Sequence, residues 1–302
     1  MTSGTSTILV TGSARSGTTW LGKVLAAAPD VRYIHEPFNF KSPFPGSAFR
    51  SRFSYEHLDP DDERLNDLEK TFCSRGRLWC LKKKNIKLRR LFRAWAKELV
   101  HRKTTSTVVK DPIAFLSAET LAKRFDIKVA VIIRRPETVI ASHLRRGWDF
   151  RNLATYVETM RSKDIWTDEQ LDATLECENT PVDRLAHLWR LLALWRIRLE
   201  ERHPDWEFVH YEDASMNPQD VFPGLCERLG LSYAGPREAF LEAMNRPSKS
   251  HRGQEAISDV ARSRSSLADP DKALEPRMDA RVKAICSQEL AMLYPKSRRG
   301  GS

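Results

Sequence analysis

A short loop bounded by Gly12 and Gly17 has the composition and position of an anion-binding site. It follows the apolar, β-branched run 6–11 and precedes the apolar-periodic stretch 20–28, so the sequence predicts a strand, a tight loop and a helix. Two glycines separated by four residues are the spacing of a P-loop, in which backbone N–H groups and the helix dipole bind phosphate. We therefore expect this loop to bind a phosphate or a related oxyanion.

The side chains of the loop narrow the choice of anion. Nucleoside triphosphatases have a lysine directly after the second glycine, whereas this sequence has Thr18. The cation lies inside the loop as Arg15, whose guanidinium can form paired hydrogen bonds with the oxygens of one phosphate or of an anhydride. The loop therefore favours a nucleotide without a triphosphate. The alternative is a strand-to-helix turn with Ser or Thr N-caps and no ligand.

The rest of the chain alternates between strand-like and helix-like segments. The strand-like segments are 31–34, 105–109, 128–133 and 206–210, and the segments with helical spacing are 115–124, 137–146, 182–202 and 278–293. This alternation predicts an α/β fold with a P-loop-like central parallel sheet flanked by helices, in a single domain over residues 1–302. Because the carboxyl ends of parallel strands meet at one sheet edge, we expect Glu36, Lys110 and Arg134 to end three strands beside the loop.

Three irregular segments are expected to lie outside this framework. Residues 37–60 are rich in Phe, Pro, Ser and Gly without periodicity, which predicts a loop over a site. Residues 246–276 are rich in Ser, Arg, Pro and Asp, which predicts either a mobile lid or a disordered arm. The basic end, 296–302, is predicted to be a solvated tail.

Composition excludes several classes of protein. The chain has 302 residues and a net charge of +10, with 41% hydrophobic residues, so it can bury a sizeable core and favours acidic ligands. No stretch has the length and apolarity of a membrane span, and the N-terminus lacks the pattern of a signal peptide, so we expect a cytoplasmic location. Five cysteines without a CxxC pair argue against a disulfide framework or a zinc site and are interpreted as buried thiols.

The run RSGTTW, residues 15–20, resembles the 5′-phosphosulfate loop of sulfotransferases that use 3′-phosphoadenosine 5′-phosphosulfate (PAPS). An arginine at its first position is typical of the carbohydrate and tyrosylprotein branches of that family, whereas the cytosolic branch has lysine. The resemblance continues through LAAAPDVRYIHEP at 25–37, KDP at 110–112, and Arg134 with Ser142, and thus covers residues 7 to about 146.

The resemblance implies a set of donor-binding residues. Arg15, Ser16, Gly17, Thr18 and Thr19 are implied to bind the 5′-phosphosulfate, Trp20 to stack on adenine, and Arg134 with Ser142 to bind the 3′-phosphate. The spacing supports the last pair, because Ser142 lies eight residues after Arg134, about two helical turns. Read alone, Arg134 could instead pair with an acid, Ser142 could be a surface hydroxyl, and Trp20 at the start of the first helix could be a core residue.

Other positions match the family less well. Arg252, in the sequence Ser-His-Arg-Gly, resembles a degenerate form of the RKG element that contacts the 3′-phosphate in cytosolic members. Arg135 stands where the family has an aspartate. Residues 211–213, Tyr-Glu-Asp, resemble a late strand end of the family that we expect to organise the fold rather than to catalyse.

Sulfuryl transfer to a hydroxyl requires a base and a cation that stabilises the leaving oxygen. Glu36 is the expected base, since the carbohydrate and tyrosylprotein branches are implied to use a glutamate here and the cytosolic branch a histidine. The neighbouring His35 is expected to point to the opposite strand face. Lys110 and Arg15 are expected to stabilise the transferred group. The alternative for Glu36 is a carboxylate that caps a loop or pairs with an arginine.

The sequence thus predicts a PAPS-dependent sulfotransferase that acts on a hydroxyl of a carbohydrate or glycosylated small molecule, without a metal and without a nucleic-acid partner. One alternative is a small-molecule kinase that uses ATP, which Thr18 disfavours. The other is a basic polyanion-binding protein without catalytic activity, which the net charge supports but no recognised binding module does.

Overall fold

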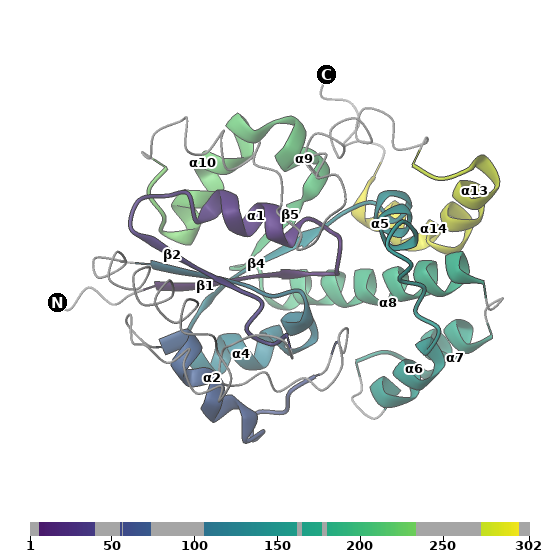
Figure 1. Cartoon of the computed structure of the whole chain (residues 1–302), viewed down its shortest axis with the longest axis horizontal. Coiled ribbons are helices and arrows are strands. Elements are labelled where there is room, and N and C mark those ends of the chain that lie inside the picture. The colour runs from purple at the N-terminus through teal and green to yellow at the C-terminus, as the bar shows by residue number, and fades with distance from the viewer. Residues whose placement is uncertain are drawn as a thin grey trace, which may run out of the picture.

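The computed structural model describes residues 6–39, 55, 57–73, 106–161, 165–176, 180–233 and 273–295. Within these residues the strands are β1 (Ser6–Gly12), β2 (Val31–His35), β3 (Ser106–Lys110), β4 (Lys128–Ile133) and β5 (Glu207–His210). They form one sheet in the order β2-β3-β1-β4-β5, and every neighbouring pair is parallel (Figure 1). The predicted parallel α/β sheet is confirmed.

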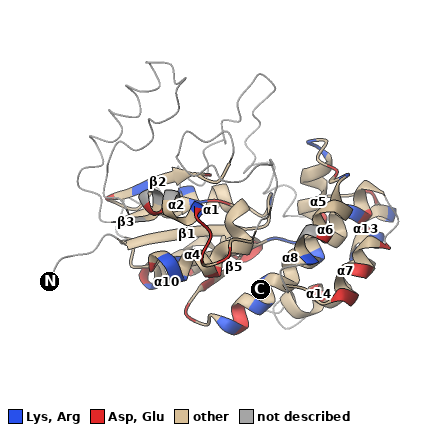
Figure 2. Ribbon diagram, turned by 90° about the horizontal axis from the view of Figure 1, so that it is seen from below, with Lys and Arg blue, Asp and Glu red and all other residues tan. Residues whose placement is uncertain are grey.

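Helices cover both faces of the sheet (Figure 1). One face carries α1 (Thr18–Leu25), α9 (Tyr211–Met216) and α10 (Pro218–Leu229), and the other carries α2 (Arg64–Cys73), α4 (Ala118–Phe125) and α8 (Pro181–Arg202). The remaining described helices are α5 (Pro136–Leu144), α6 (Leu153–Arg161), α7 (Asp168–Leu175), α13 (Pro276–Ile285) and α14 (Ser287–Leu293). These five gather with α8 on one side of the sheet (Figure 2).

Alternating strand residues build two separate cores. In β1, Ile8 and Val10 pack with α1 and α10 on one face, whereas Leu9 packs with the helices of the other face, and all three are fully buried. β4 repeats the pattern, since Ala130 and Ile132 belong to the first core and Val131 to the second. A strand buried on both faces reads as a continuous apolar run, which is why the segment 128–133 could be recognised in the sequence.

Three element boundaries differ from the prediction. β2 ends at His35 rather than at Glu36, because Glu36 has a left-handed backbone with φ of 46°. The predicted helix 278–293 is divided into α13 and α14 at Cys286, which leaves the helical region (φ −96°, ψ 12°) and buries its side chain. The helix expected at 115–124 is preceded by a 3-10 turn, Ile113–Ser117, and becomes α-helical at Ala118.

The sheet register places the chemistry-bearing residues at one edge. Val10 and His35 flank Lys110 from the two neighbouring strands, so the ends of β1, β2 and β3 lie side by side. Gly12 lies opposite Ile132, with φ of 139°, and a Cβ atom there would come within 2.1 Å of the Ile132 carbonyl oxygen. Only glycine fits this close approach of two strands where the loop begins.

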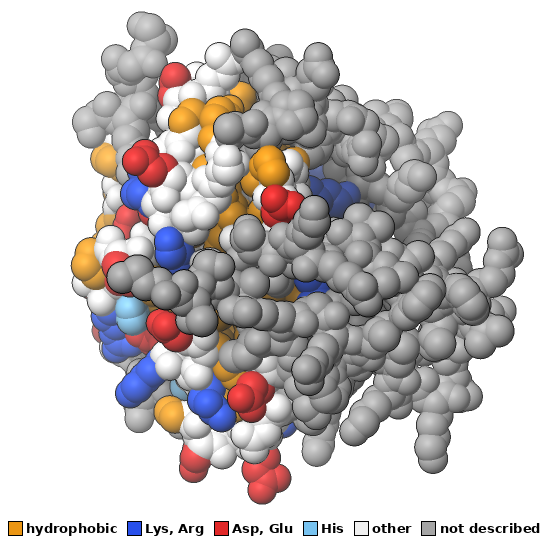
Figure 3. Space-filling model, turned by 90° about the vertical axis from the view of Figure 1, so that its left-hand side faces the viewer, with side chains coloured by type: hydrophobic (Ala, Val, Ile, Leu, Met, Phe, Trp, Pro, Cys, Tyr) orange, Lys and Arg blue, Asp and Glu red, His pale blue; other side chains and the backbone are white. Residues whose placement is uncertain are grey.

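Some predictions fall outside the described residues, among them the arm up to residue 272 and the tail 296–302. Cys226 and Cys286 are free and buried, as expected for these two thiols. Among the described helices, none has both the length and the apolarity to cross a membrane. On the described part of the face shown in Figure 3, acidic and basic side chains are interspersed.

Candidate active site

The loop between β1 and α1 has the backbone conformation of an anion cradle. Arg15 and Gly17 both have positive φ angles, of 68° and 103°, which turn the chain sharply before the helix. The Ser16 hydroxyl donates to the Ser13 carbonyl at 2.5 Å and holds the turn from inside. Gly17 is the N-cap of α1 and provides no side-chain cap, so the Ser or Thr cap of the alternative interpretation is not what begins this helix. The first N–H groups of a helix lack intrahelical partners and favour an anion.

Arg15 is oriented by a residue from a different part of the chain. Its Nε donates to the Ser142 hydroxyl at 2.8 Å, and its guanidinium carbon lies 5.9 Å from the centre of the Trp148 ring. Ser142 is buried and lies on α5. A serine hydroxyl that accepts one hydrogen bond still has its own proton to donate. The Arg15 and Ser142 side chains therefore form one continuous polar unit.

Glu36 and Lys110 form an ion pair at the ends of β2 and β3. The Lys110 Nζ donates to Glu36 Oε1, and the Glu36 backbone N–H donates to the Lys110 carbonyl at 2.8 Å. The other carboxylate oxygen accepts from the Asn39 side-chain amide at 3.0 Å. The Lys110 side chain is 2% exposed and that of Glu36 is 24% exposed, so the pair is covered on the lysine side and open on the carboxylate side.

The charge of Lys110 controls the protonation of Glu36. Burial acts to raise the pKa of Glu36, but the ammonium and hydrogen bond of Lys110 outweigh it and lower the pKa to about 2. The left-handed backbone of Glu36 is unusual for a residue with a side chain, and such conformations concentrate at functional sites. The pair is thus a stable carboxylate held against a buried cation.

His35 lies closer to the carboxylate than strand alternation predicts. Its Nε2 is 3.8 Å from Glu36 Oε1, whereas the sequence predicted that the two side chains would lie on opposite faces. Alternation applies only within a strand, and the turn at Glu36 brings both side chains to the same side. His35 is half exposed, its Nδ1 lies 3.2 Å from the Tyr33 hydroxyl, and burial and Lys110 lower its pKa to about 4.

Lys110 is positioned by the turn that follows it. The buried Asp111 accepts the Phe38 N–H at 2.8 Å and the Ile113 N–H at 2.9 Å, which fixes the turn after β3 and the segment after Glu36. Burial raises the pKa of Asp111 to about 7. On the opposite side, a Cβ atom at Gly22 of α1 would lie 3.0 Å from the Lys110 Cβ, so α1 approaches the lysine closely. Asp111 thus organises the backbone on both sides of the Glu36–Lys110 pair.

Arg134 ends β4 with a buried guanidinium. The residue is 7% exposed, and its Nε has no hydrogen-bond partner in the described structure. Its guanidinium carbon lies 4.3 Å from the centre of the Tyr211 ring, and its carbonyl accepts from the Trp189 indole N–H at 2.9 Å. An arginine donor that is buried and unpaired fits an anionic ligand group.

Trp20 does not present a free ring face. It is 9% exposed and packs edge-to-face against Tyr211 at 5.2 Å and Phe222 at 5.7 Å between ring centres. The structure therefore places Trp20 in the core of one sheet face rather than at an open stacking surface. Thr18 is buried and Thr19 is partly buried at the start of α1. Arg252 lies outside the described residues.

Three neighbours of the site were not predicted from the sequence. The Tyr55 hydroxyl accepts the Ala14 N–H of the loop at 2.7 Å, and Tyr211 packs beneath Arg134. Asn39 contacts Glu36, as described above. Of the three, only Tyr211 had a signal in the sequence, because it is the first residue of the Tyr-Glu-Asp motif. Most of the loop predicted at 37–60, namely residues 40–54, lies outside the described residues.

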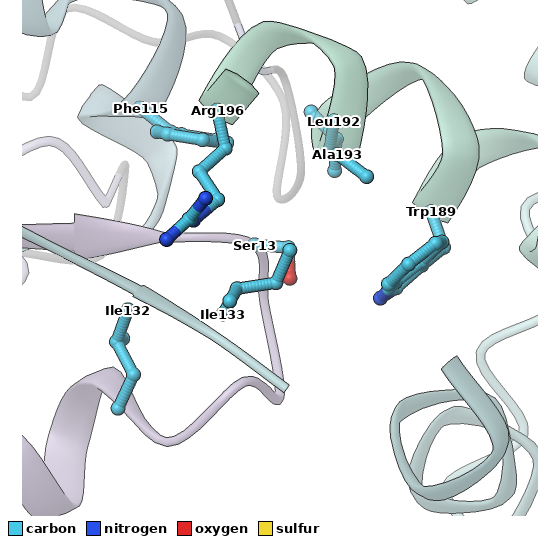
Figure 4. Close-up of a pocket in the computed structure, with 8 residues that line it drawn as sticks. All are labelled: Ser13, Phe115, Ile132, Ile133, Trp189, Leu192, Ala193 and Arg196. Atoms are coloured by element: carbon cyan, nitrogen blue, oxygen red, sulfur yellow. The ribbon is translucent and has the colours of Figure 1, made fainter. Parts of the chain in front are cut away.

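A small cavity lies behind the loop, between β4 and α8 (Figure 4). Its lining is Ser13, Phe115, Ile132, Ile133, Trp189, Leu192, Ala193 and Arg196. Most of these side chains are apolar, and Arg196 is the one basic residue in the lining. The cavity therefore lacks the several cations that a phosphate-bearing nucleotide requires.

Comparisons with known proteins identify the family of this chain. A model of the sulfotransferase family matches residues 7–235. The sulfotransferase domain from the curacin biosynthetic pathway is 18% identical over 94% of this chain and 97% of that domain, with a TM-score of 0.46. The sulfotransferase domain from the olefin synthase of Synechococcus PCC 7002 is 16% identical over 94% of this chain and 93% of that domain, with a TM-score of 0.43. No curated protein matches the chain. The family model covers most of the chain, which therefore belongs to the sulfotransferase family, the enzymes that use PAPS as sulfuryl donor.

Proposed function

We propose that this enzyme transfers the sulfuryl group to a hydroxyl of a carbohydrate or a glycosylated small molecule, with Glu36 as general base. The observation that carries the proposal is the Glu36–Lys110 pair at the sheet edge, beside the loop that contains Arg15. A carboxylate open to one side and a cation buried behind it supply the two groups that sulfuryl transfer to a hydroxyl requires.

The residues present fit the donor. PAPS supplies a sulfuryl group attached to a phosphate, and it carries a second phosphate at the 3′ position. The loop residues Arg15 to Thr19 and the N-terminus of α1 suit the 5′ end. The unpaired Arg134 Nε and the Ser142 hydroxyl proton suit the 3′-phosphate. Because Trp20 is buried, this assignment names no residue that stacks on the adenine.

The ion pair explains how Glu36 becomes a stronger base during the reaction. While Lys110 contacts Glu36, the low pKa makes the carboxylate a poor proton acceptor. An oxyanion that draws the Lys110 ammonium away removes the main cause of the lowered pKa. Burial, the largest contribution, is then opposed only by the weaker effects of His35 and Asn39, so the pKa of Glu36 rises. Lys110 in turn stabilises charge on the leaving oxygen.

The proposed acceptor class depends on the similarity of Glu36 and the surrounding 25–37 segment to the carbohydrate branch. Its test is an acceptor screen that measures transfer of labelled sulfate from PAPS to sugars, glycosides and phenols. We expect transfer to sugar or glycoside hydroxyls, and Glu36→Gln is expected to reduce kcat at least 100-fold. Transfer to phenols alone, with no glycoside accepted, would remove the carbohydrate assignment.

The donor assignment is tested separately by thermal unfolding. Adenosine 3′,5′-bisphosphate at 100 times its Kd should stabilise the folded enzyme by about 2.7 kcal/mol. The stabilisation should be lost in Arg134→Ala, whereas Glu36→Gln should retain it, because Glu36 is proposed to contact the acceptor and not the nucleotide. Stabilisation by ATP with Mg²⁺ alone would favour the kinase alternative, and stabilisation by neither nucleotide would contradict the proposed donor site.

A further inference from the structure

Tyr294 lies at the end of α14, outside the residues matched by the family model, yet it contacts the turn that carries Arg134. Its hydroxyl donates to Glu212 Oε2 at 3.1 Å. The guanidinium carbon of Arg135 lies 5.2 Å from the centre of its ring, and the His210 ring packs edge-on at 4.9 Å. The C-terminal helices thus reach the ends of β4 and β5.

Glu212 connects this tyrosine to the start of α5. Its Oε1 accepts the backbone N–H of Arg135 at 2.9 Å, and its Oε2 accepts from Tyr294. Arg135 is the N-cap of α5 and makes no side-chain cap of its own. An N-cap side chain accepts the N–H of the second or third helical residue, whereas Glu212 accepts the N–H of the N-cap residue itself and brings its negative charge to the helix start from a different element. The chain thus has an acidic group at this helix start although position 135 is arginine.

The side chain of Arg135 faces this cluster. Its Nη2 lies 3.1 Å from Glu137 Oε1, in addition to its position over the Tyr294 ring. Arg135 is therefore held through its Nη2 and its ring contact, although its buried Nε, like that of Arg134, has no hydrogen-bond partner among the described residues. The two adjacent arginines have different environments, and the cluster of Arg135, Glu137, Glu212 and Tyr294 fixes the backbone between them.

We propose that Tyr294 is a positioning residue for binding of the donor's 3′-phosphate, acting through Glu212 on the turn between Arg134 and Arg135. The inference rests on the proposed role of Arg134. It assigns a function to the C-terminal helices that the matched region 7–235 does not contain: they complete the support of the nucleotide site.

Loss of the Tyr294 hydroxyl has a defined consequence. Glu212 Oε2 loses the donor that helps to keep this carboxylate ionised. Burial already raises the pKa of Glu212, and removal of a hydrogen bond to the charged form raises it further. A protonated Glu212 accepts the Arg135 N–H more weakly, so the start of α5 becomes less well fixed. Arg134 directly precedes this turn and Ser142 follows on the same helix, so both are displaced together.

The test compares two nucleotides that differ only in the 3′-phosphate. Calorimetric titration of the full-length enzyme with adenosine 3′,5′-bisphosphate and adenosine 5′-monophosphate gives the preference for the 3′-phosphate as a ratio of Kd values. For Tyr294→Phe we expect the Kd for the bisphosphate to rise about tenfold and the Kd for the monophosphate to stay within twofold. Tyr233→Phe, at an exposed tyrosine, is the matched control and should change neither value.

The outcomes separate this inference from the proposed function. If the unaltered enzyme shows no preference for the bisphosphate, the proposed donor site is wrong. If the preference exists and Tyr294→Phe retains it, or if the variant loses affinity for both nucleotides equally, Tyr294 has no positioning role for the 3′-phosphate. Glu212→Gln provides a second variant, with the same expected loss of preference. The variant with both substitutions should have a Kd for the bisphosphate no higher than that of the weaker-binding single variant, because both substitutions act on one contact.

Discussion

The Nε atom of Arg15 donates a 2.8 Å hydrogen bond to the hydroxyl of Ser142, although the two residues are 127 positions apart in the chain. Arg15 belongs to the loop proposed to bind the 5′ end of the donor, and Ser142 belongs to the pair proposed to bind its 3′-phosphate. The bond therefore joins the two ends of the proposed nucleotide site. A change at either end is expected to affect the other.

Removal of the Ser142 hydroxyl should weaken both ends of the site. Ser142→Ala deletes the proposed contact to the 3′-phosphate and the acceptor for Arg15 Nε, so we expect the Kd for adenosine 3′,5′-bisphosphate to rise about tenfold or more. The kcat should fall as well, because Arg15 is no longer oriented. Ser287→Ala, at an exposed serine, is the control for titration and steady-state assays. A change in Kd without a change in kcat would show that Arg15 does not depend on Ser142.

Gly17 should tolerate no side chain. Gly17→Ala places a Cβ atom 2.5 Å from Tyr211 Cδ2 at a φ of 103°, so we expect a loss of about 2 kcal/mol or more in the free energy of unfolding. Gly147→Ala is a matched control, because Gly147 also has a positive φ but has nothing within 4 Å of the added atom, and it should cost about 1 kcal/mol. Equal losses in urea unfolding would mean that the contact with Tyr211 is unimportant.

Tyr55 should stabilise the loop through a single hydrogen bond. Tyr55→Phe leaves the buried Ala14 N–H without its acceptor, which costs about 1–3 kcal/mol and should raise the KM for PAPS. Tyr156→Phe is the comparison, because it removes the acceptor of the Tyr55 backbone N–H instead of the acceptor of the Ala14 N–H. If both variants raise the KM equally, the effect belongs to packing of the two rings and not to the loop amide.

Acid should abolish the contribution of the Glu36–Lys110 pair to stability. The pKa of Glu36 is lowered from 4.5 to about 2 in the folded enzyme, so the pair stabilises the fold fully above pH 4.5 and loses this effect as the pH falls towards 2. Urea unfolding of the wild type and Glu36→Gln at several pH values checks this. The wild type should be more stable above pH 4.5, and the difference should vanish near pH 2, where a protonated glutamate resembles glutamine. A difference that is independent of pH would contradict the lowered pKa.

His35 is expected to be dispensable for proton abstraction. His35→Gln should retain at least one tenth of the wild-type kcat, because the ring is half exposed and Glu36 holds the hydrogen-bonded position against Lys110. Steady-state kinetics of His35→Gln beside Glu36→Gln provide the measurement. The reverse order of activities would assign the base to His35.

Local patterns were sufficient to predict the sheet and the edge at which the site lies. The alternation in β1 and the apolar run of β4 are determined by burial on both faces, so they are visible in the sequence. Glu36 follows β2 and Lys110 ends β3, so the contact between them followed from topology, and Arg134 follows β4 at the same edge of the sheet.

Contacts that depend on distant segments could not be predicted. The burial of Trp20 depends on Tyr211 and Phe222, which lie in the helices that follow β5, far along the chain from Trp20. The contact of Tyr55 with the loop comes from a segment without periodicity. The orientation of His35 depends on one φ angle at Glu36, which an ordinary residue adopts only because the surrounding turn imposes it.

The central strand of the sheet is the first to be synthesised. Ser6 of β1 pairs with Ser106 of β3, and Ile8 pairs with Lys128 of β4, so neither neighbour exists when β1 leaves the ribosome. One of its backbone edges stays open until β3 is complete at residue 110, and the other until β4 is complete at residue 133. Non-local parallel pairing of this kind folds slowly and leaves the growing chain prone to aggregate. The yield of active enzyme should therefore rise when synthesis is slowed by low temperature or when chaperones are supplied.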